Sequence, residues 1–266
     1  MTVIREPAVA GQFYPGTASE LSTTIRVYLD EAEVQQGPAP KALIVPHAGY
    51  VYSGPVAASA YARLRPYRQH YTRVILLGPC HRVAVQGLAL SGADVFRTPL
   101  GDVPLDKDAI ANLELPDVKV FDATHQFEHS LEVHLPFLQS VIESFSLVPL
   151  VVGHVPPETV ARVIDALWGG PETLIVISSD LSHYLTYDEA RASDKTTCEA
   201  IENLQAQSID HDKACGATLI GGLLIATKRR GMRVITLDLR NSGDTAGDKS
   251  HVVGYGSWMF LENDRI

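Results

Sequence analysis

Short runs of aliphatic and β-branched residues alternate with helical patterns along almost the whole chain. The expected strands are 42–45, 73–77, 87–90, 118–121, 147–152, 173–177, 233–239 and 252–260. The expected helices are 18–33, 54–64, 157–167, 188–204 and 213–229, with another from about 124 to 145. Parallel strands need crossovers, and helices usually supply them. The alternation therefore predicts an α/β fold with a mainly parallel or mixed central sheet covered by helices.

Two local features refine this prediction. Pro136 lies inside the apolar pattern of the helix expected at 124–145, and proline disrupts a helix interior, so we expect a kink or a late start. Only residues 35–40 (QQGPAP) resemble a linker, and they lie too near the N-terminus to separate two domains. We therefore predict one domain, residues 1–266.

Charge and cysteine content exclude several classes of partner and compartment. The 22 Lys and Arg residues are outnumbered by 31 Asp and Glu, and no basic stripe is present, so nucleic acid is not an expected partner. The three cysteines are widely spaced and do not form a disulfide framework. No apolar signal region follows Arg5 and Glu6, and the longest weakly polar run, 214–227, is too short for a membrane span. We expect a cytoplasmic protein without a membrane partner.

Polar residues follow four of the expected strands. The residues placed there are His47, His81, Asp180 with His183, and Asp244. Ligands of open α/β sheets bind beyond the carboxyl ends of the strands, so these side chains are expected to meet in one crevice.

Two histidines and one anionic ligand can hold a transition metal ion and leave positions open for a substrate. Taken singly, a histidine after a strand is more often an ordinary hydrogen-bonded loop residue, and only the joint pattern of His47 and His81 favours a metal. Asp244 and Cys215 are both candidates for the anionic ligand. Cys215 lies at the expected start of a helix, which stabilises a thiolate, although a small buried hydrophobic residue is the alternative.

A second polar cluster lies in the helix expected at 124–145. Its members are His125, Glu128, His129, Glu132 and His134. The spacing is not that of HExxH, so a zincin is not indicated. One face of this helix is expected to line the crevice, with Glu132 or His134 orienting the ligands; a polar face in solvent is the alternative.

Several segments resemble the Memo family, whose prokaryotic members are called protein B of the AmmeMemoRadiSam system. The resemblance is carried by 5–15 (REPAVAGQFYP), 46–54 (PHAGYVYSG), 78–81 (GPCH), 128–136 (EHSLEVHLP), 178–184 (SSDLSHY) and 214–216 (ACG). These motifs span nearly the whole chain. The resemblance implies a fold similar to the LigB-like class III extradiol dioxygenases, and a radical-SAM-system protein as a partner.

The resemblance also implies roles for individual residues. His47 and His81 match the two metal-binding histidines of the family, and Cys215 matches its cysteine ligand, which leaves Asp244 as the fallback. His183 matches the acid/base histidine of the dioxygenases, with Asp180 beside it. The true dioxygenases carry a carboxylate in place of this cysteine, so ring cleavage is not implied.

The sequence therefore favours an iron- or copper-dependent, dioxygenase-like oxidoreductase, with zinc also tolerated. His183 and Asp180 would transfer protons, while Glu132 or His134 would steady the bound species. Two alternatives stay open. One is a non-catalytic module that binds a small molecule, a peptide or a partner protein, and the other is a metal-dependent hydrolase.

Overall fold

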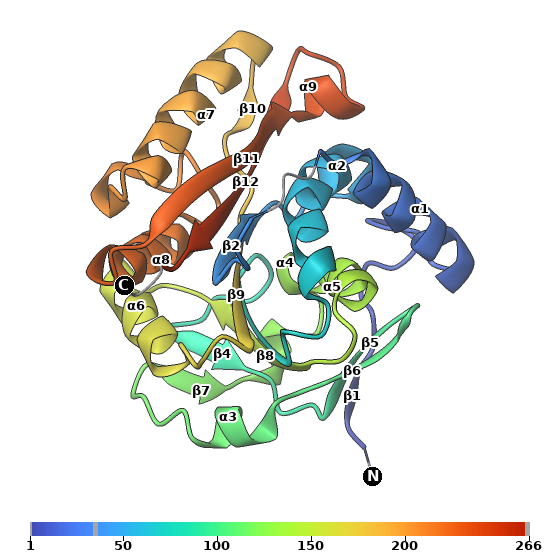
Figure 1. The fold of residues 1–266 in the computed structure, drawn as a ribbon, viewed down its shortest axis with the longest axis vertical. Helices are drawn as coiled ribbons and strands as arrows, with labels where there is room; N and C mark the ends of the chain where they lie inside the picture. Colours follow the sequence, from blue (N-terminus) through green and yellow to red (C-terminus); the bar gives the residue numbers. More distant parts are fainter. Residues whose placement is uncertain (1, 34–36, 264–266) are drawn as a thin grey trace.

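The computed structural model describes residues 2–33 and 37–263, and it has a central mixed sheet with helices on both faces (Figure 1). The sheet has nine strands in the order β10-β12-β2-β9-β3-β8-β4-β7, and β11 pairs with β12. In chain order these are β2 (Ala42–Val45), β3 (Arg73–Pro79), β4 (Leu88–Leu90), β7 (Val118–Val120), β8 (Ser146–Val152), β9 (Thr173–Ser178), β10 (His183–Leu185), β11 (Arg233–Asn241) and β12 (Val252–Leu261). The predicted α/β class is confirmed.

The centre of the sheet is parallel and its margins are antiparallel. Strand β9 lies between β2 and β3, and β8 follows β3, all in parallel register. Strand β12 then adds antiparallel to β2, and β4 adds antiparallel to β8. The carboxyl ends of β2, β9 and β3 consequently lie side by side at one edge of the sheet.

Nine α-helices and three short 3-10 helices lie within the described ranges. The α-helices are α1 (Ala18–Glu31), α2 (Tyr50–Tyr61), α3 (Lys107–Ala111), α4 (His129–Glu132), α5 (Leu135–Val141), α6 (Pro157–Ala166), α7 (Tyr187–Glu202), α8 (Ala217–Arg229) and α9 (Ser242–Thr245). The 3-10 helices are η1 (Ala62–Tyr67), η2 (Asp122–Thr124) and η3 (Ala206–Ser208). None of the helices described is long and apolar enough to cross a membrane.

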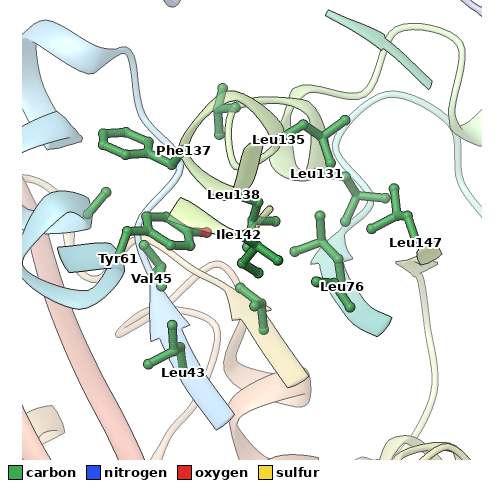
Figure 2. Close-up of a cluster of buried hydrophobic side chains, with 14 of the residues drawn as sticks. Leu43, Val45, Tyr61, Leu76, Leu131, Leu135, Phe137, Leu138, Ile142 and Leu147 are labelled. Atoms are coloured by element: carbon green, nitrogen blue, oxygen red, sulfur yellow. The ribbon is translucent and has the colours of Figure 1, made fainter. Parts of the chain in front are cut away.

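Alternate residues of each central strand enter different hydrophobic cores, because successive side chains of a strand point to opposite faces. Leu43 and Val45 of β2 belong to the core that includes residues of α1, α2 and α5, and Figure 2 shows Val45 beside Tyr61 with Leu43 further along the same strand. Ile44 of the same strand belongs to the other core, against α6, α7 and α8. Both faces of the central strands are therefore buried, which explains why they read as unbroken apolar runs.

The single helix expected at 124–145 is wrong. The chain instead forms η2, the short helix α4 and the separate helix α5. Pro136 lies in the first turn of α5, where a missing N–H costs nothing, so the late start expected from this proline is confirmed. His125 lies outside α4, and its spacing from His129 is therefore not that of one helix face.

A second, three-stranded sheet was not predicted. It joins β1 (Ile4–Arg5), β5 (Val95–Thr98) and β6 (Gly101–Pro104) in the order β1-β5-β6. Residues 35 and 36 of the linker-like stretch lie outside the described residues. The N-terminal segment, residues 5–14, runs from this small sheet to the end of the central sheet where the polar residues gather, and it contacts Glu132 and His129 there.

Candidate metal centre

Three histidines bring their ring nitrogens together at the carboxyl ends of the central strands. His47 follows β2, His81 follows β3, and His129 is the first residue of α4. One ligand nitrogen of each lies within 4.8 Å of the others. The sequence pattern predicted His47 and His81 as ligands, whereas it gave His129 only a place in the second polar cluster.

The ring of His47 is held in one tautomer by Ser178. The Ser178 hydroxyl donates its only proton to the carbonyl of Ser130 at 2.6 Å. Ser178 Oγ also lies 2.6 Å from His47 Nδ1, and with its proton already donated it can only accept there. His47 Nδ1 therefore carries the ring proton. Burial lowers the pKa of His47 well below its ordinary value, and the neighbouring His81 and His129 lower it further. His47 is thus neutral, with the lone pair on Nε2.

His81 is held by the carboxylate of Glu128. His81 Nδ1 lies 2.9 Å from Glu128 Oε1, and the His81 backbone N–H donates to Glu128 Oε2 at 2.6 Å. Burial opposes the ionisation of Glu128, but the hydrogen bonds and charge of His81 and the Ser130 N–H outweigh it and lower the Glu128 pKa to about 2. An ionised carboxylate only accepts, so Nδ1 of His81 carries a proton, and Nε2 is the ring nitrogen left for a metal ion.

His129 stacks on His81, with ring centroids 4.8 Å apart and planes 23° apart. The ring of Phe13 packs against it from the N-terminal segment, also at 4.8 Å. Burial lowers the pKa of His129, against the opposing charge of Glu128. His129 Nδ1 is buried and has no hydrogen-bond partner among the described atoms. This ring is therefore neutral and incompletely satisfied, as expected of a metal ligand.

The donor set fits a metal ion. Neutral imidazoles are good ligands of zinc, copper and iron. Bonds of about 2.0–2.1 Å to a tetrahedral ion place two nitrogens about 3.4 Å apart. A cluster within 4.8 Å therefore has to contract by about an ångström to bind the ion. Side-chain rotations can supply that movement at the partly exposed His81.

Cys215 lies beside this cluster. Its Sγ is 3.4 Å from His47 Nε2, close to the ~3.6 Å expected for a nitrogen and a sulfur on one tetrahedral ion. Among the described residues, the three donor atoms that all lie within 4.8 Å of one another belong to the three histidines. Coordination by Cys215 thus stays a prediction.

The expected stabilisation of a Cys215 thiolate by a helix terminus is wrong. Cys215 precedes the N-cap of α8, but burial raises its pKa to about 12, and the nearby Asp180 charge adds to the rise. Without a bound cation this sulfur is therefore a thiol.

The fallback ligand Asp244 has other partners. Its carboxylate accepts from Tyr187 Oη and from the backbone N–H of Asn241, where it caps α9. The geometry therefore favours Cys215 over Asp244 as the residue next to the histidines.

Asp180 lies in the cluster as the sequence predicted. Its Oδ1 accepts from the backbone N–H of His47 at 2.7 Å, and its Oδ2 lies 4.0 Å from His47 Nε2. Burial raises its pKa. His183 begins β10 in an exposed position, near enough to influence the charge of both Asp180 and His47. Proton transfer between the cluster and solvent by these two residues stays a prediction.

Glu132 binds the N-terminal segment. Its carboxylate accepts from the backbone N–H groups of Ala8 and Val9, from Tyr14 Oη at 2.6 Å, and from Arg5. These bonds give Glu132 a structural function, and a role at the metal stays a prediction.

His134 is fully buried behind the cluster, with Nδ1 2.8 Å from Tyr61 Oη. Its Nε2 has no partner in the described parts of the chain, and burial holds its pKa well below the ordinary value. The orienting role that the sequence assigned to Glu132 or His134 stays a prediction, and the residue that contacts His81 Nδ1 is Glu128. A signal for it was present, because Glu128 directly precedes His129 in the quoted EHS motif.

Comparisons with known proteins agree over nearly the full length. A family model described as Memo-like protein matches residues 5–259. A MEMO1 family protein of Aquifex aeolicus is 37% identical over 271 residues, which cover 97% of this chain and 99% of that protein. One from Methanosarcina barkeri is 36% identical and covers 96% and 98%. The crystal structure of an uncharacterized protein from Escherichia coli K12 aligns with a TM-score of 0.48 at 13% identity, over 83% of this chain and 100% of the other.

Proposed function

We propose that this chain, which belongs to the Memo family, binds an iron or copper ion at His47, His81 and His129 and serves in oxidation–reduction chemistry. One observation carries the proposal, the convergence of three imidazoles at the ends of the parallel strands. The Cys215 sulfur, 3.4 Å from His47 Nε2, would be a further ligand.

The donor types support a transition metal. Imidazoles and a thiol are soft or intermediate ligands that suit copper and iron, and zinc is also tolerated, whereas magnesium and calcium prefer oxygen. When bound, such an ion supplies a redox-active Lewis acid with positions open to a small ligand. His81 is partly exposed, so solvent and small molecules have access from its side.

The chain's own residues supply binding and proton transfer. Burial lowers the pKa values of His47 and His129, so both rings are unprotonated near neutral pH, which is the state that binds metal. Asp180, with its raised pKa, can hold a proton beside His47, and the exposed His183 can pass it to solvent. The Asp180–His47 backbone hydrogen bond keeps this carboxyl in place.

Two exposed tyrosines support a ligand at this site. Tyr184, next to His183, is 73% exposed, and Tyr52, in the first turn of α2 after His47, is 41% exposed. Exposed aromatic side chains are frequent at binding surfaces. We propose a small molecule or a short peptide as the ligand. All three cysteines are free thiols, which supports a reducing compartment such as the cytoplasm.

A zinc-dependent hydrolase is the second candidate, and the three-histidine set favours it. Three protein ligands and an open position are typical of catalytic zinc, which lowers the pKa of water. Asp180 would then serve as the base.

Oxygen uptake after anaerobic metal loading tests the proposal. The protein is loaded with iron(II), copper(I) or zinc, beside His47→Ala and a control, His251→Ala, which removes an exposed histidine outside the cluster. With ascorbate present as the electron donor, we expect the iron or copper form of wild type and of the control to consume oxygen faster than the free metal ion does, and His47→Ala to lose this excess. A fully loaded protein that consumes oxygen no faster than the free metal ion contradicts the redox function, and ester or phosphoester turnover by the zinc form would establish the hydrolase instead.

A further inference from the structure

We propose that Glu128 is the positioning residue of the metal centre, because its single carboxylate determines which ring nitrogen His81 and His129 present to the ion. This inference rests on the proposed metal binding. It assigns Glu128 a function that acts through the two histidines and not on a substrate.

The contact with His81 holds both the ring and the backbone. Glu128 Oε1 accepts from Nδ1 at 2.9 Å, and Oε2 accepts from the backbone N–H at 2.6 Å. Together these two contacts keep the Nδ1 edge of the His81 ring towards Glu128. Nε2 is then the nitrogen of His81 that is left to bind an ion.

The contact with His129 completes the arrangement. His129 Nδ1 lies 3.4 Å from the same Oε1, and the two imidazoles are stacked. Both Nδ1 atoms therefore face one oxygen, and the Nε2 atoms lie on the side away from Glu128. When Nε2 of His129 binds an ion, the ring proton stays on Nδ1, and Glu128 Oε1 is in place to accept a hydrogen bond from it. This also gives a partner to a buried nitrogen that otherwise has none among the described residues.

Glu128 itself has little freedom to move. Its side chain is 1% exposed, and Oε1 also accepts the Ser130 N–H at 3.0 Å, which caps α4. The Ser130 carbonyl accepts from Ser178, whose oxygen in turn accepts from His47 Nδ1. The three residues 128–130 thus supply one ligand and set the tautomers of the other two.

Glutamine cannot replace this carboxylate. Glu128 accepts three hydrogen bonds at two oxygens, from His81 Nδ1, the His81 N–H and the Ser130 N–H. An amide has one accepting oxygen and one donating NH₂, so at least one backbone N–H meets another donor in Glu128→Gln. If the NH₂ faces Nδ1, the His81 proton must move to Nε2, which blocks the metal-binding nitrogen.

Glu132→Gln is the matched control. Glu132 is an equally buried carboxylate on the same segment, and its partners belong to the N-terminal segment. Both variants remove a buried charge and cost stability, but only Glu128→Gln removes a contact to the cluster histidines.

The experiment measures zinc affinity by chelator competition at a temperature where circular dichroism shows all forms folded. We expect wild type and Glu132→Gln to bind alike and Glu128→Gln to bind roughly 10- to 100-fold more weakly, the usual effect of losing such a partner. A Glu128→Gln protein that binds as tightly as wild type overturns the inference. Wild type that binds none of zinc, iron(II) and copper(I) instead contradicts the proposed function.

Nitrogen-15 NMR of the histidine rings in wild type gives an independent test that needs no variant. We expect the proton of His81 on Nδ1 with and without zinc, and zinc on Nε2 of both His81 and His129. Zinc on Nδ1 of either ring would overturn the inference, even if Glu128→Gln fails to fold.

Discussion

Replacement of Glu132 by alanine should destabilise the protein strongly and leave its metal affinity unchanged. The Glu132 side chain is completely buried and accepts from Arg5, Tyr14 and the backbone of Ala8 and Val9. Removal of one partner from a buried ion pair typically costs about 3–5 kcal/mol, because the other charge is left uncompensated. For a chain of this size, roughly 2–4 °C of melting temperature is lost per kcal/mol, so we expect a decrease of about 6–20 °C.

A double-mutant cycle separates the ion pair from the other contacts. Urea unfolding is measured for wild type, Arg5→Met, Glu132→Ala and the double variant. We expect the double variant to lose less stability than the sum of the single losses, because neither charge is then left alone. Zinc titration of the same samples should give equal zinc affinities for wild type and Glu132→Ala. A stability loss below about 1 kcal/mol, together with weaker metal binding, would refute the structural assignment and place Glu132 at the metal, as the sequence predicted.

Two further predictions concern protons. Asp194 is a buried residue of α7, and burial raises its pKa to about 6. Between about pH 4 and 6 the folded state therefore binds more protons than the unfolded state. The free energy of unfolding then falls by up to about 3 kcal/mol as the pH rises through that range. Asp194→Asn should remove this dependence, which urea unfolding at pH 4, 5, 6 and 7 would detect; an unchanged dependence contradicts the assignment. If Cys215 coordinates, its thiol, with a pKa of about 12, must lose its proton, so wild type should release about one proton more than Cys215→Ser on binding zinc. Calorimetry in two buffers of different ionisation enthalpy counts these protons, and equal counts would show that Cys215 is not a ligand.

The central strands could be predicted well because burial on both faces leaves a simple signal. Strand β2 was predicted residue for residue, and β9 was one residue longer than expected. The small sheet was missed because β1 has two residues and forms only by pairing with β5, which is remote in sequence. No local pattern encodes that pairing.

The two glutamates of this segment could not be told apart from the sequence, because the single helix expected at 124–145 does not form around them. In an unbroken helix Glu128 and Glu132 would lie one turn apart on one face. Glu128 is instead the N-cap residue of α4 and faces His81, while Glu132 ends the same short helix and faces the N-terminal segment. Helical spacing therefore could not distinguish Glu128, which contacts His81, from Glu132, which contacts the N-terminal segment.

The Cys215 pKa shows a second limit of local reasoning. A position at a helix start favours the thiolate, but the cost of burying a charge depends on the tertiary surroundings and exceeds that benefit here. The sequence showed the helix and could not show the burial or the approach of Asp180.

Metal content of anaerobically purified protein tests the central claim most directly. Mass spectrometry is applied to wild type and His81→Ala, which removes one of the three converging imidazoles. We predict close to one equivalent of iron or copper in wild type, lost in the variant. Wild type that is purified without metal and cannot be loaded with iron, copper or zinc would contradict the account.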